Sequence, residues 1–152
     1  MRISATGSSG FSLLELLAAL TIAGFLLAVA VPSGTRFYES MQLRQAVRDS
    51  MTLFLSARQR ALQSGRPQDV LVYPQQRLLR LGEETRQLPG KFRVSVTGAR
   101  ELNRERAGVI RFYPEGGASG GEMTLENPGS GGTRILVDWL AGRVTQERYD
   151  VR

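Results

Sequence analysis

Residues 10–32 read GFSLLELLAALTIAGFLLAVAVP, and the rest of the chain is organised around this stretch. From Phe11 to Val31 the one charged residue is Glu15, and the other polar side chains are Ser12 and Thr21, each able to bond to a helix carbonyl. As a helix, these 21 residues would be about 31 Å long, the hydrocarbon thickness of a bilayer. The stretch also lacks the polar stripe of an amphipathic helix. It therefore predicts a membrane-spanning helix.

The residues before this stretch argue against a secretory signal peptide. A signal peptide carries an apolar run of roughly 7–15 residues with a small-residue cleavage site after it. Here the apolar run is longer, and the small residues Ser8-Ser9-Gly10 precede it. This order predicts that a leader, Met1–Gly10, is removed and that the apolar helix is retained.

Glu15 places a carboxylate inside this apolar helix. Such a residue costs up to about 2.5–3.5 kcal/mol near the centre of a membrane and less toward its edge, so a partner is expected. Glu15 lies four residues after Phe11, which puts both on one helix face. Removal of the leader would free the Phe11 amine, and we expect it to pair with Glu15, most usefully between neighbouring chains. The alternative is a protonated glutamate tolerated near the lipid headgroups.

The segment Gly10–Leu16 resembles the type III signal of type IV pilins and type II secretion pseudopilins. The shared features are glycine before the cut, phenylalanine after it, Glu15, an unbroken apolar helix and Pro32 near its end. The resemblance implies that a prepilin peptidase cleaves between Gly10 and Phe11 and that the Phe11 amine is N-methylated. It implies a filament subunit of the inner membrane, with a cytoplasmic N-terminus and a periplasmic head. The implied partners are major and minor pseudopilins, packed through their helices, the inner-membrane assembly platform and the lipid bilayer.

The pattern changes at Pro32, where a kink or weak point is expected because proline removes a helical hydrogen bond. Helical periodicity then resumes from residue 35 to residue 64, and Gly65 and Pro67 favour a stop. Residues 33–65 are thus predicted to form an amphipathic stalk helix whose apolar side covers a sheet. That side is expected to contain Phe37, Met41, Val47, Met51, Phe54 and Ala61.

After Pro67 the sequence period becomes two, which is typical of strands. Strands are expected at 70–73, 77–81, 92–96, 109–113, 123–125, 134–138 and 142–145, with turns at 74–76 and 87–90 and a charged surface loop at 98–107. The predicted fold is α+β, with the long helix packed on a small antiparallel sheet or sandwich. The expected regions are a leader (1–10), a membrane and filament-core helix (11–32), a stalk helix (33–65) and a β head (66–152).

Two glycine-rich segments, 114–121 and 127–132, need a separate explanation. A phosphate-binding loop would require Gly-Lys-Ser/Thr at the start of a helix, whereas the first segment has no lysine and precedes a predicted strand. We expect both segments to be hairpin turns in which glycines adopt positive φ. Both are expected to be mobile and able to meet a partner.

The composition removes most catalytic chemistry. The chain has no cysteine and no histidine, so thiol chemistry, Ser-His-Asp catalysis and the commonest metal ligand are excluded. The net charge is +6, from 20 basic and 14 acidic residues, and Lys91 is the one lysine. The arginines are interspersed with acids, which favours a solvated surface over a dedicated anion site. We expect no enzyme activity, no catalytic residue, no cofactor and no metal site; a calcium site at Asp138 would need further oxygen ligands.

The C-terminal part of the sequence indicates which family of pilin-like proteins the chain resembles. The sequences FYPEGGASGG (112–121) and ILVDWLAGRV (135–144) are similar to the pattern of the GspH/FimT family, the minor pseudopilins of type II secretion and their type IV pilus relatives. Trp139-Leu140-Ala141 departs from it, since the secretion proteins often have a proline and a threonine there. The resemblance implies a structural subunit at or near the tip of the periplasmic pseudopilus. The alternative is a minor pilin for DNA uptake or adhesion, but nucleic-acid binding is not expected, because acids dilute the basic residues Arg143, Arg148 and Arg152.

Overall fold

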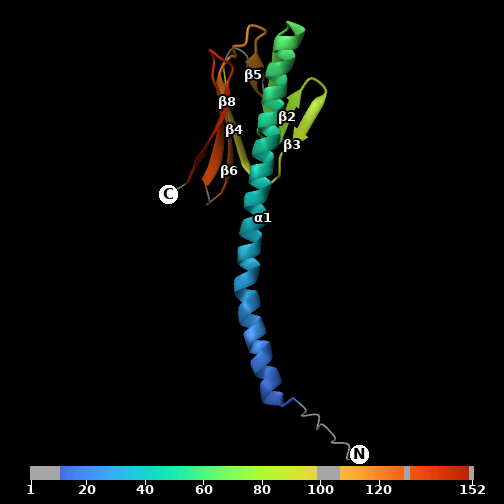
Figure 1. The fold of residues 1–152 in the computed structure, drawn as a ribbon, viewed down its shortest axis with the longest axis vertical. Helices are drawn as coiled ribbons and strands as arrows, with labels where there is room; N and C mark the ends of the chain where they lie inside the picture. Colours follow the sequence, from blue (N-terminus) through green and yellow to red (C-terminus); the bar gives the residue numbers. More distant parts are fainter. Residues whose placement is uncertain (1–10, 99–106, 129–130, 151–152) are drawn as a thin grey trace, which may run out of the picture. The chain divides into compact units, whose positions relative to one another are not determined.

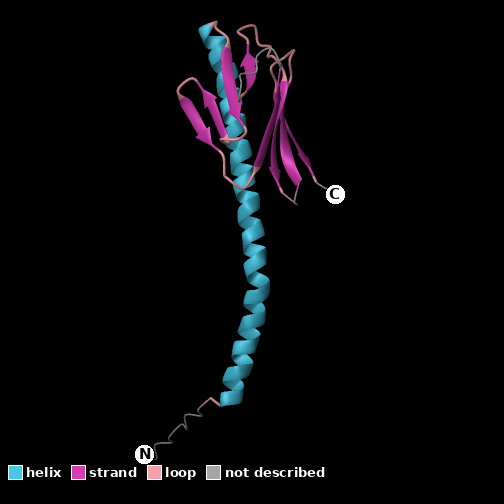
Figure 2. Cartoon of the chain, turned by 180° about the vertical axis from the view of Figure 1, so that it is seen from behind, coloured by secondary structure: helices cyan, strands magenta, loops and turns pink. Residues whose placement is uncertain are grey.

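The computed structural model describes residues 11–98, 107–128 and 131–150, except for the side chains of residues 29–36. One long helix, α1 (Leu13–Ser64), precedes eight strands within these described residues (Figures 1 and 2). The chain divides into two compact units, Met1–Ser40 and Met41–Arg152. The boundary falls within α1, so the helix contributes to both units.

Ser12 sets the start of α1. Its Oγ accepts a hydrogen bond from the Glu15 N–H at 3.1 Å, and its carbonyl accepts one from the Leu16 N–H at 3.1 Å. This is the geometry of an N-cap, which satisfies a backbone donor that has no partner within the helix. Within the described residues, no helix combines the length and the apolar character needed to cross a membrane.

The far end of α1 agrees with the sequence prediction. The helix ends at Ser64, and Gly65 follows with a φ of 64° while its N–H donates to the Ala61 carbonyl at 3.1 Å. A glycine in this left-handed conformation is a common helix stop. Between its ends α1 is one continuous helix. The kink at Pro32 stays a prediction, because that side chain lies outside the described part.

The strands form two antiparallel four-stranded sheets. The first sheet has the order β3 (Glu84–Gln87), β2 (Leu78–Leu81), β1 (Gln68–Tyr73) and β5 (Gly108–Phe112). The second has the order β4 (Arg93–Gly98), β6 (Gly121–Asn127), β7 (Gly131–Val137) and β8 (Val144–Tyr149). All neighbouring strands are antiparallel. The α+β fold class predicted from the sequence is confirmed.

The core lies where the second half of α1 runs along both sheets (Figures 1 and 2). The rings of Phe54 and Phe112 pack at 6.4 Å between centroids and an angle of 52°. The buried apolar residues of the helix recur on one face. They are Ala46, Val47, Leu53, Phe54, Ala57 and Ala61, and they share one apolar cluster with residues of both sheets.

The predicted apolar side of the stalk is confirmed only in its later part. Phe37 and Met41 were expected to cover a sheet, but they expose 69% and 52% of their surface. The expectation fails because the buried face begins at Ala46, and helical spacing alone does not show where a sheet starts. The members that are buried or half-buried are Val47, Met51, Phe54 and Ala61.

One strand that the sequence did not predict, and one whose end it placed too early, both lie at sheet edges. β3 was not predicted, because its sequence Glu-Thr-Arg-Gln has no apolar alternation; it forms by pairing with β2. β8 runs to Tyr149, beyond the predicted end at 145, because the edge of the second sheet accepts its polar residues. The surface loop predicted at 98–107 falls mostly outside the described residues.

The glycine-rich segment 114–121 is not a hairpin. It connects β5 of the first sheet to β6 of the second, so the prediction of a hairpin there was wrong. The prediction of positive φ was correct, with 100° at Gly116 and 71° at Gly120. The other segment does connect the neighbours β6 and β7, as predicted, although residues 129–130 lie outside the described part.

Candidate functional site

The predicted assembly residues lie at the start of α1. Phe11 exposes 82% of its surface, and Glu15 is exposed in the first turn. A carboxylate is stabilised there by the unpaired N–H groups and the dipole of the helix. The S-x-x-E spacing of Ser12 and Glu15 is typical of a capping box. We expected the Ser12 hydroxyl to bond to a helix carbonyl, whereas its Oγ accepts from the Glu15 N–H. The S-x-x-E spacing is the sequence signal that indicates this cap.

The helix around Glu15 presents apolar side chains on all sides. These side chains expose between 55% and 77% of their surface. Thr21 donates from Oγ1 to the Ala18 carbonyl at 2.8 Å, as predicted, which satisfies the hydroxyl within the helix. Among the described residues, no cation forms an ion pair with Glu15. The exposed large side chains are Leu13, Leu14, Leu16, Leu17, Leu20, Ile22, Phe25, Leu26 and Leu27.

The structure does not bring the predicted ion pair together. The amine of Phe11 exists only after the leader is removed, and the pair is expected between two chains. Gly10, on the other side of the predicted cut, lies outside the described residues. The cleavage between Gly10 and Phe11, the methylation of Phe11, the ion pair of Glu15 and the kink at Pro32 therefore stay predictions.

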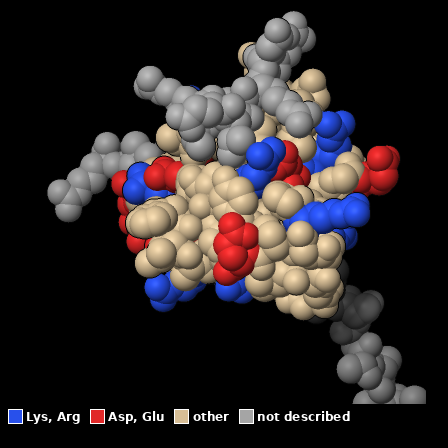
Figure 3. Space-filling view, turned by 90° about the horizontal axis from the view of Figure 1, so that it is seen from above, with Lys and Arg blue, Asp and Glu red and all other residues tan. Residues whose placement is uncertain are grey.

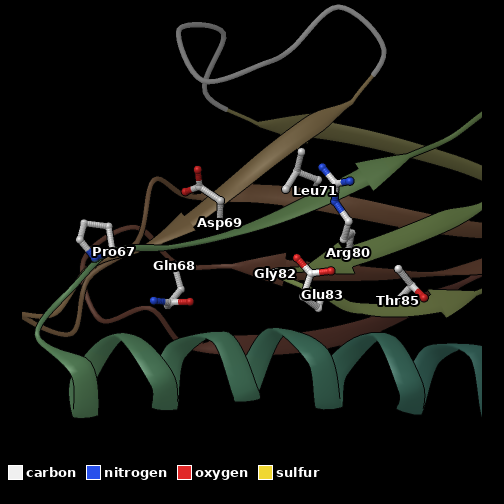
Figure 4. Close-up of a pocket in the computed structure, with 8 residues that line it drawn as sticks. All are labelled: Pro67, Gln68, Asp69, Leu71, Arg80, Gly82, Glu83 and Thr85. Atoms are coloured by element: carbon white, nitrogen blue, oxygen red, sulfur yellow. The ribbon is translucent and has the colours of Figure 1, made fainter.

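The second unit contains an open groove of about 610 Å³ beside the turn between β2 and β3 (Figure 4). Leu71 and Arg80 point away from α1 in this view, whereas Gln68 points toward it. The guanidinium of Arg80 lies over the ring of Tyr73, 5.7 Å from its centre. The groove is lined by Pro67, Gln68, Asp69, Leu71, Arg80, Gly82, Glu83 and Thr85.

Asp69, which lines this groove, is held by a neighbouring strand. Arg111 donates from Nε and Nη2 to its two carboxylate oxygens at 2.6 and 2.8 Å, and the two residues are directly opposite each other on β1 and β5. This hydrogen bonding raises the pKa of Arg111 above its usual range. The Asp69 carboxylate thus joins two neighbouring strands. The sequence contains no local signal for this ion pair, because 42 positions separate Asp69 and Arg111.

Metal-binding chemistry finds no support in the described ranges, which contain no group of three or more acids, histidines or cysteines. Asp138, considered for calcium, accepts a hydrogen bond at Oδ1 from the Ala141 N–H at 2.7 Å. That bond closes the turn between β7 and β8. The Asp138 carboxylate therefore stabilises the backbone of its own turn.

Many of the arginines in the second unit are paired with acids. Arg60 of α1 and Arg86 of β3 both contact Glu84, at 2.6 and 2.7 Å. Arg134 contacts Glu122 at 2.8 Å, while Arg93 and Glu126 are 3.5 Å apart. Because these arginines lie beside acids, they do not form the uniformly basic surface that nucleic acids favour. Of the tail residues, Arg143 and Arg148 are exposed, and Arg152 lies outside the described residues.

Comparisons with known proteins agree with the N-terminal motif and the fold. Residues 6–31 match the prokaryotic N-terminal methylation motif. The fold is similar to that of the minor pseudopilin EpsH from the type 2 secretion system of Vibrio cholerae, with a TM-score of 0.56 over 70% of this chain and 97% of that one. At 10% identity, this likeness shows the fold alone. Motif and fold together define a pilin-like protein, in which a methylation-type N-terminal helix carries an antiparallel β head.

The sequence is also similar to a curated relative, the type II secretion system protein H of Xanthomonas campestris pv. campestris. The two are 33% identical over 140 residues, which cover 91% of this chain and 80% of the relative. At this identity and coverage, the chain belongs to the family of type II secretion system protein H, a minor pseudopilin. It is a structural subunit and not an enzyme. The family resemblance stated from the sequence is confirmed.

Proposed function

We propose that this chain is a subunit at or near the tip of the periplasmic pseudopilus and that it enters the fibre through the first turns of α1. The observation that carries the proposal is Glu15, a single carboxylate among exposed apolar side chains. A surface of this kind is stable only in lipid or against other apolar helices. The sequence relative supplies the secretion system to which the fibre belongs.

Processing is the first step of this proposal. A prepilin peptidase removes Met1–Gly10, and the new amine of Phe11 becomes methylated; the support is the motif match over residues 6–31. Residues 11–31 anchor the protein once in the inner membrane, with the N-terminus in the cytoplasm and the head in the periplasm. This span is inferred from the sequence, since residues 29–31 lack described side chains.

Assembly is the second step. In an apolar environment the charge of Glu15 is costly until a cation meets it. The N-terminal amine of a neighbouring pseudopilin can supply this cation, because in a parallel helix bundle it lies within about one helical turn of Glu15 along the axis. Pairing would therefore attract each subunit and set its position along the fibre. The inner-membrane assembly platform would bring the subunits together.

Each region of the chain has its own role in anchoring and assembly. Residues 11–32 form the membrane anchor and then the core of the filament, and Pro32 allows a change of direction at its end. Residues 33–65 form the stalk, and residues 66–152 form the head. The support for the stalk is the buried helix face between Ala46 and Ala61, which fastens the helix to both sheets.

The test replaces Glu15 by leucine in the full-length chain, in cells that assemble the pseudopilus. We expect Glu15→Leu to leave membrane insertion intact and to lower recovery in the fibre roughly tenfold, because a lost charge pair is worth more than about 1.4 kcal/mol in apolar surroundings. Recovery is measured by immunoblotting of sheared fibres, and insertion by carbonate extraction of membranes.

The matched control is Thr21→Leu, which removes a polar side chain from the same helix without touching the charge. Thr21 already bonds within its own helix, so this variant should enter the fibre normally. Equal recovery of Glu15→Leu and Thr21→Leu would contradict the pairing mechanism. A mature protein that still begins with Met1, shown by intact mass, would contradict the processing step.

A further inference from the structure

An exposed apolar surface lies at the end of the second unit where α1 terminates. Trp139 and Leu140, in the turn between β7 and β8, expose 68% and 70% of their surface, and Leu62 in the last turns of α1 exposes 43%. Figure 3 looks onto this end and shows broad uncharged areas interrupted by acidic and basic side chains. We call the surface formed by Leu62, Trp139 and Leu140 the end patch.

The turn that carries the end patch is held by hydrogen bonds. The Trp139 carbonyl accepts from the Ala118 N–H at 2.9 Å, and the Ala141 N–H donates to Asp138 Oδ1 at 2.7 Å. The Asp138 N–H also donates to the Arg143 carbonyl at 2.9 Å. The exposure of Trp139 and Leu140 is therefore imposed by a fixed turn.

The three residues of the end patch are connected through the glycine-rich segment 114–121. Leu62 lies against Gly116, where an added Cβ would be 3.9 Å from the Leu62 Cδ2. An added Cβ at Gly117 would be only 3.1 Å from the Trp139 carbonyl oxygen. The helix end, this segment and the turn thus form one continuous surface.

Arg58 adds a charge to the border of the end patch. Its Nη2 donates to the Ala141 carbonyl at 3.2 Å, while its Nε is buried and has no hydrogen-bond acceptor. In the described ranges, no carboxylate forms an ion pair with Arg58, unlike Arg60 two residues later, which pairs with Glu84. A half-buried guanidinium without a counter-charge is complementary to an acid on another molecule.

We propose that the end patch is the docking surface for the head of a neighbouring, different pseudopilin, which offers an apolar pocket bordered by a carboxylate. This inference rests on the proposed function. Tryptophan and arginine are the side chains that most often dominate interface energies, especially in rigid settings that lose little entropy on binding. The pocket would receive Trp139 and Leu140, and the carboxylate would pair with Arg58.

The charge decides against a second copy of this chain as the occupant. A twofold contact of the end patch with itself would place both copies of Arg58 in one interface, because the same surface is used on both sides. Two unpaired guanidinium groups repel one another in such a desolvated contact. A different subunit that carries an acid avoids this repulsion.

The test uses the full-length chain in cells that assemble the pseudopilus, with the photo-crosslinker p-benzoylphenylalanine at one position. Trp139→p-benzoylphenylalanine should form an adduct with another pseudopilin, mapped by mass spectrometry to its head. The matched control is Gln75→p-benzoylphenylalanine, an exposed position in the turn between β1 and β2. We expect roughly tenfold more of this adduct from position 139 than from position 75, as for a hot-spot contact.

Two further variants, each carrying the crosslinker at 139, separate charge from structure. Arg58→Gln keeps an N–H donor for the Ala141 carbonyl but loses the charge, and it should lower the adduct several-fold at an unchanged melting temperature. Arg58→Lys keeps the charge and should restore much of the yield. Equal yields from Arg58→Gln and the parent would overturn the role of the charge.

The proposal as a whole fails if the yield at 139 equals that at 75, or if the adduct contains lipid, a secreted protein or only a second copy of this chain. Fibre recovery is measured in the same cells by immunoblotting. Normal recovery without the adduct overturns this inference alone. Failure of the chain to co-purify with any pseudopilin overturns the proposed function, and the inference falls with it.

Discussion

At the scale of single residues, Ser12 and Glu15 determine how α1 begins. Ser12 caps the helix, and Glu15 occupies the third helical position, where a carboxylate also favours the helix end. The cap matters because α1 begins at Leu13, only three residues after the predicted cleavage site. The proposed pairing group thus stands in a well-formed first turn.

We predict that Ser12→Ala loosens this first turn. The loss of an N-cap costs about 1 kcal/mol, so the Glu15 amide should exchange with solvent roughly fivefold faster. Hydrogen exchange of the mature protein in detergent micelles measures this rate. Ser12→Asp is the control, because aspartate is also a good N-cap and should keep the slow rate. Equal exchange in Ser12→Ala and the parent would show that the cap does not stabilise the turn.

Tyr149 allows a prediction about pH. Burial raises the pKa of its phenol above the ordinary value of 10.0; Glu126 and Glu122 add to the effect, and Arg134 and Arg93 oppose it. A raised folded-state pKa means that the phenol favours folding fully below pH 10 and loses this contribution as the pH rises through the higher value. Ultraviolet difference titration should show a late phenol that Tyr149→Phe removes. A titration of this phenol at or below pH 10 would contradict the assignment.

At the scale of elements, two loops that connect strands pack against each other and hold each other in place. The segment 114–121 and the turn 138–142 approach so closely that an added Cβ at Gly142 would lie 2.6 Å from the Gly116 carbonyl oxygen. Gly142 also has a φ of 57°. We expected the first glycine-rich segment to be mobile. In the structure its backbone forms hydrogen bonds to the turn 138–142 and to β5.

We predict that Gly142→Ala destabilises the second unit by more than Gly82→Ala. Both glycines have nearly the same φ, 57° and 59°, and this conformation costs alanine about 1–2 kcal/mol. An added Cβ at Gly82 meets nothing within 4 Å, whereas at Gly142 it meets backbone. Chemical denaturation should show the excess, about 1–3 kcal/mol for a steric overlap of this kind. Equal destabilisation would mean that the loops move apart readily.

At the scale of the whole molecule, the β head depends on the helix. The compact second unit contains residues 41–64 together with the strands, since the buried face of α1 closes the core of both sheets. A head of this size buries little apolar surface by itself. The helix that we propose to enter the fibre therefore also stabilises the head.

We predict that Phe54→Ala unfolds or nearly unfolds the second unit. Phe54 is completely buried between the sheets and packs on Phe112, and loss of such a ring costs about 3–5 kcal/mol. That loss is comparable with the whole stability of a small domain. The control is Leu55→Ala, because Leu55 exposes 48% of its surface and should change stability by about 0.5 kcal/mol. Urea unfolding followed by circular dichroism measures both, and similar midpoints would contradict the role of the core.

Local patterns carried most of what the sequence by itself determined. The apolar run after Gly10, the spacing of Phe11 and Glu15, the helix stop at Gly65 and the alternation of apolar and polar residues in β4 all depend on residues near one another in the chain. Such signals act through backbone geometry and short-range burial, which a single sequence displays. They were sufficient for the fold class and the family.

Only the tertiary structure decided how the strands divide into two sheets and which residues meet across them. The polar strand β3, the ion pair between Asp69 and Arg111, and the end patch with Arg58 depend on partners that are distant in sequence. Their positions follow from the packing of both sheets on one helix face. A side chain's exposure or charge pairing is a property of that packing, so no local pattern could supply it.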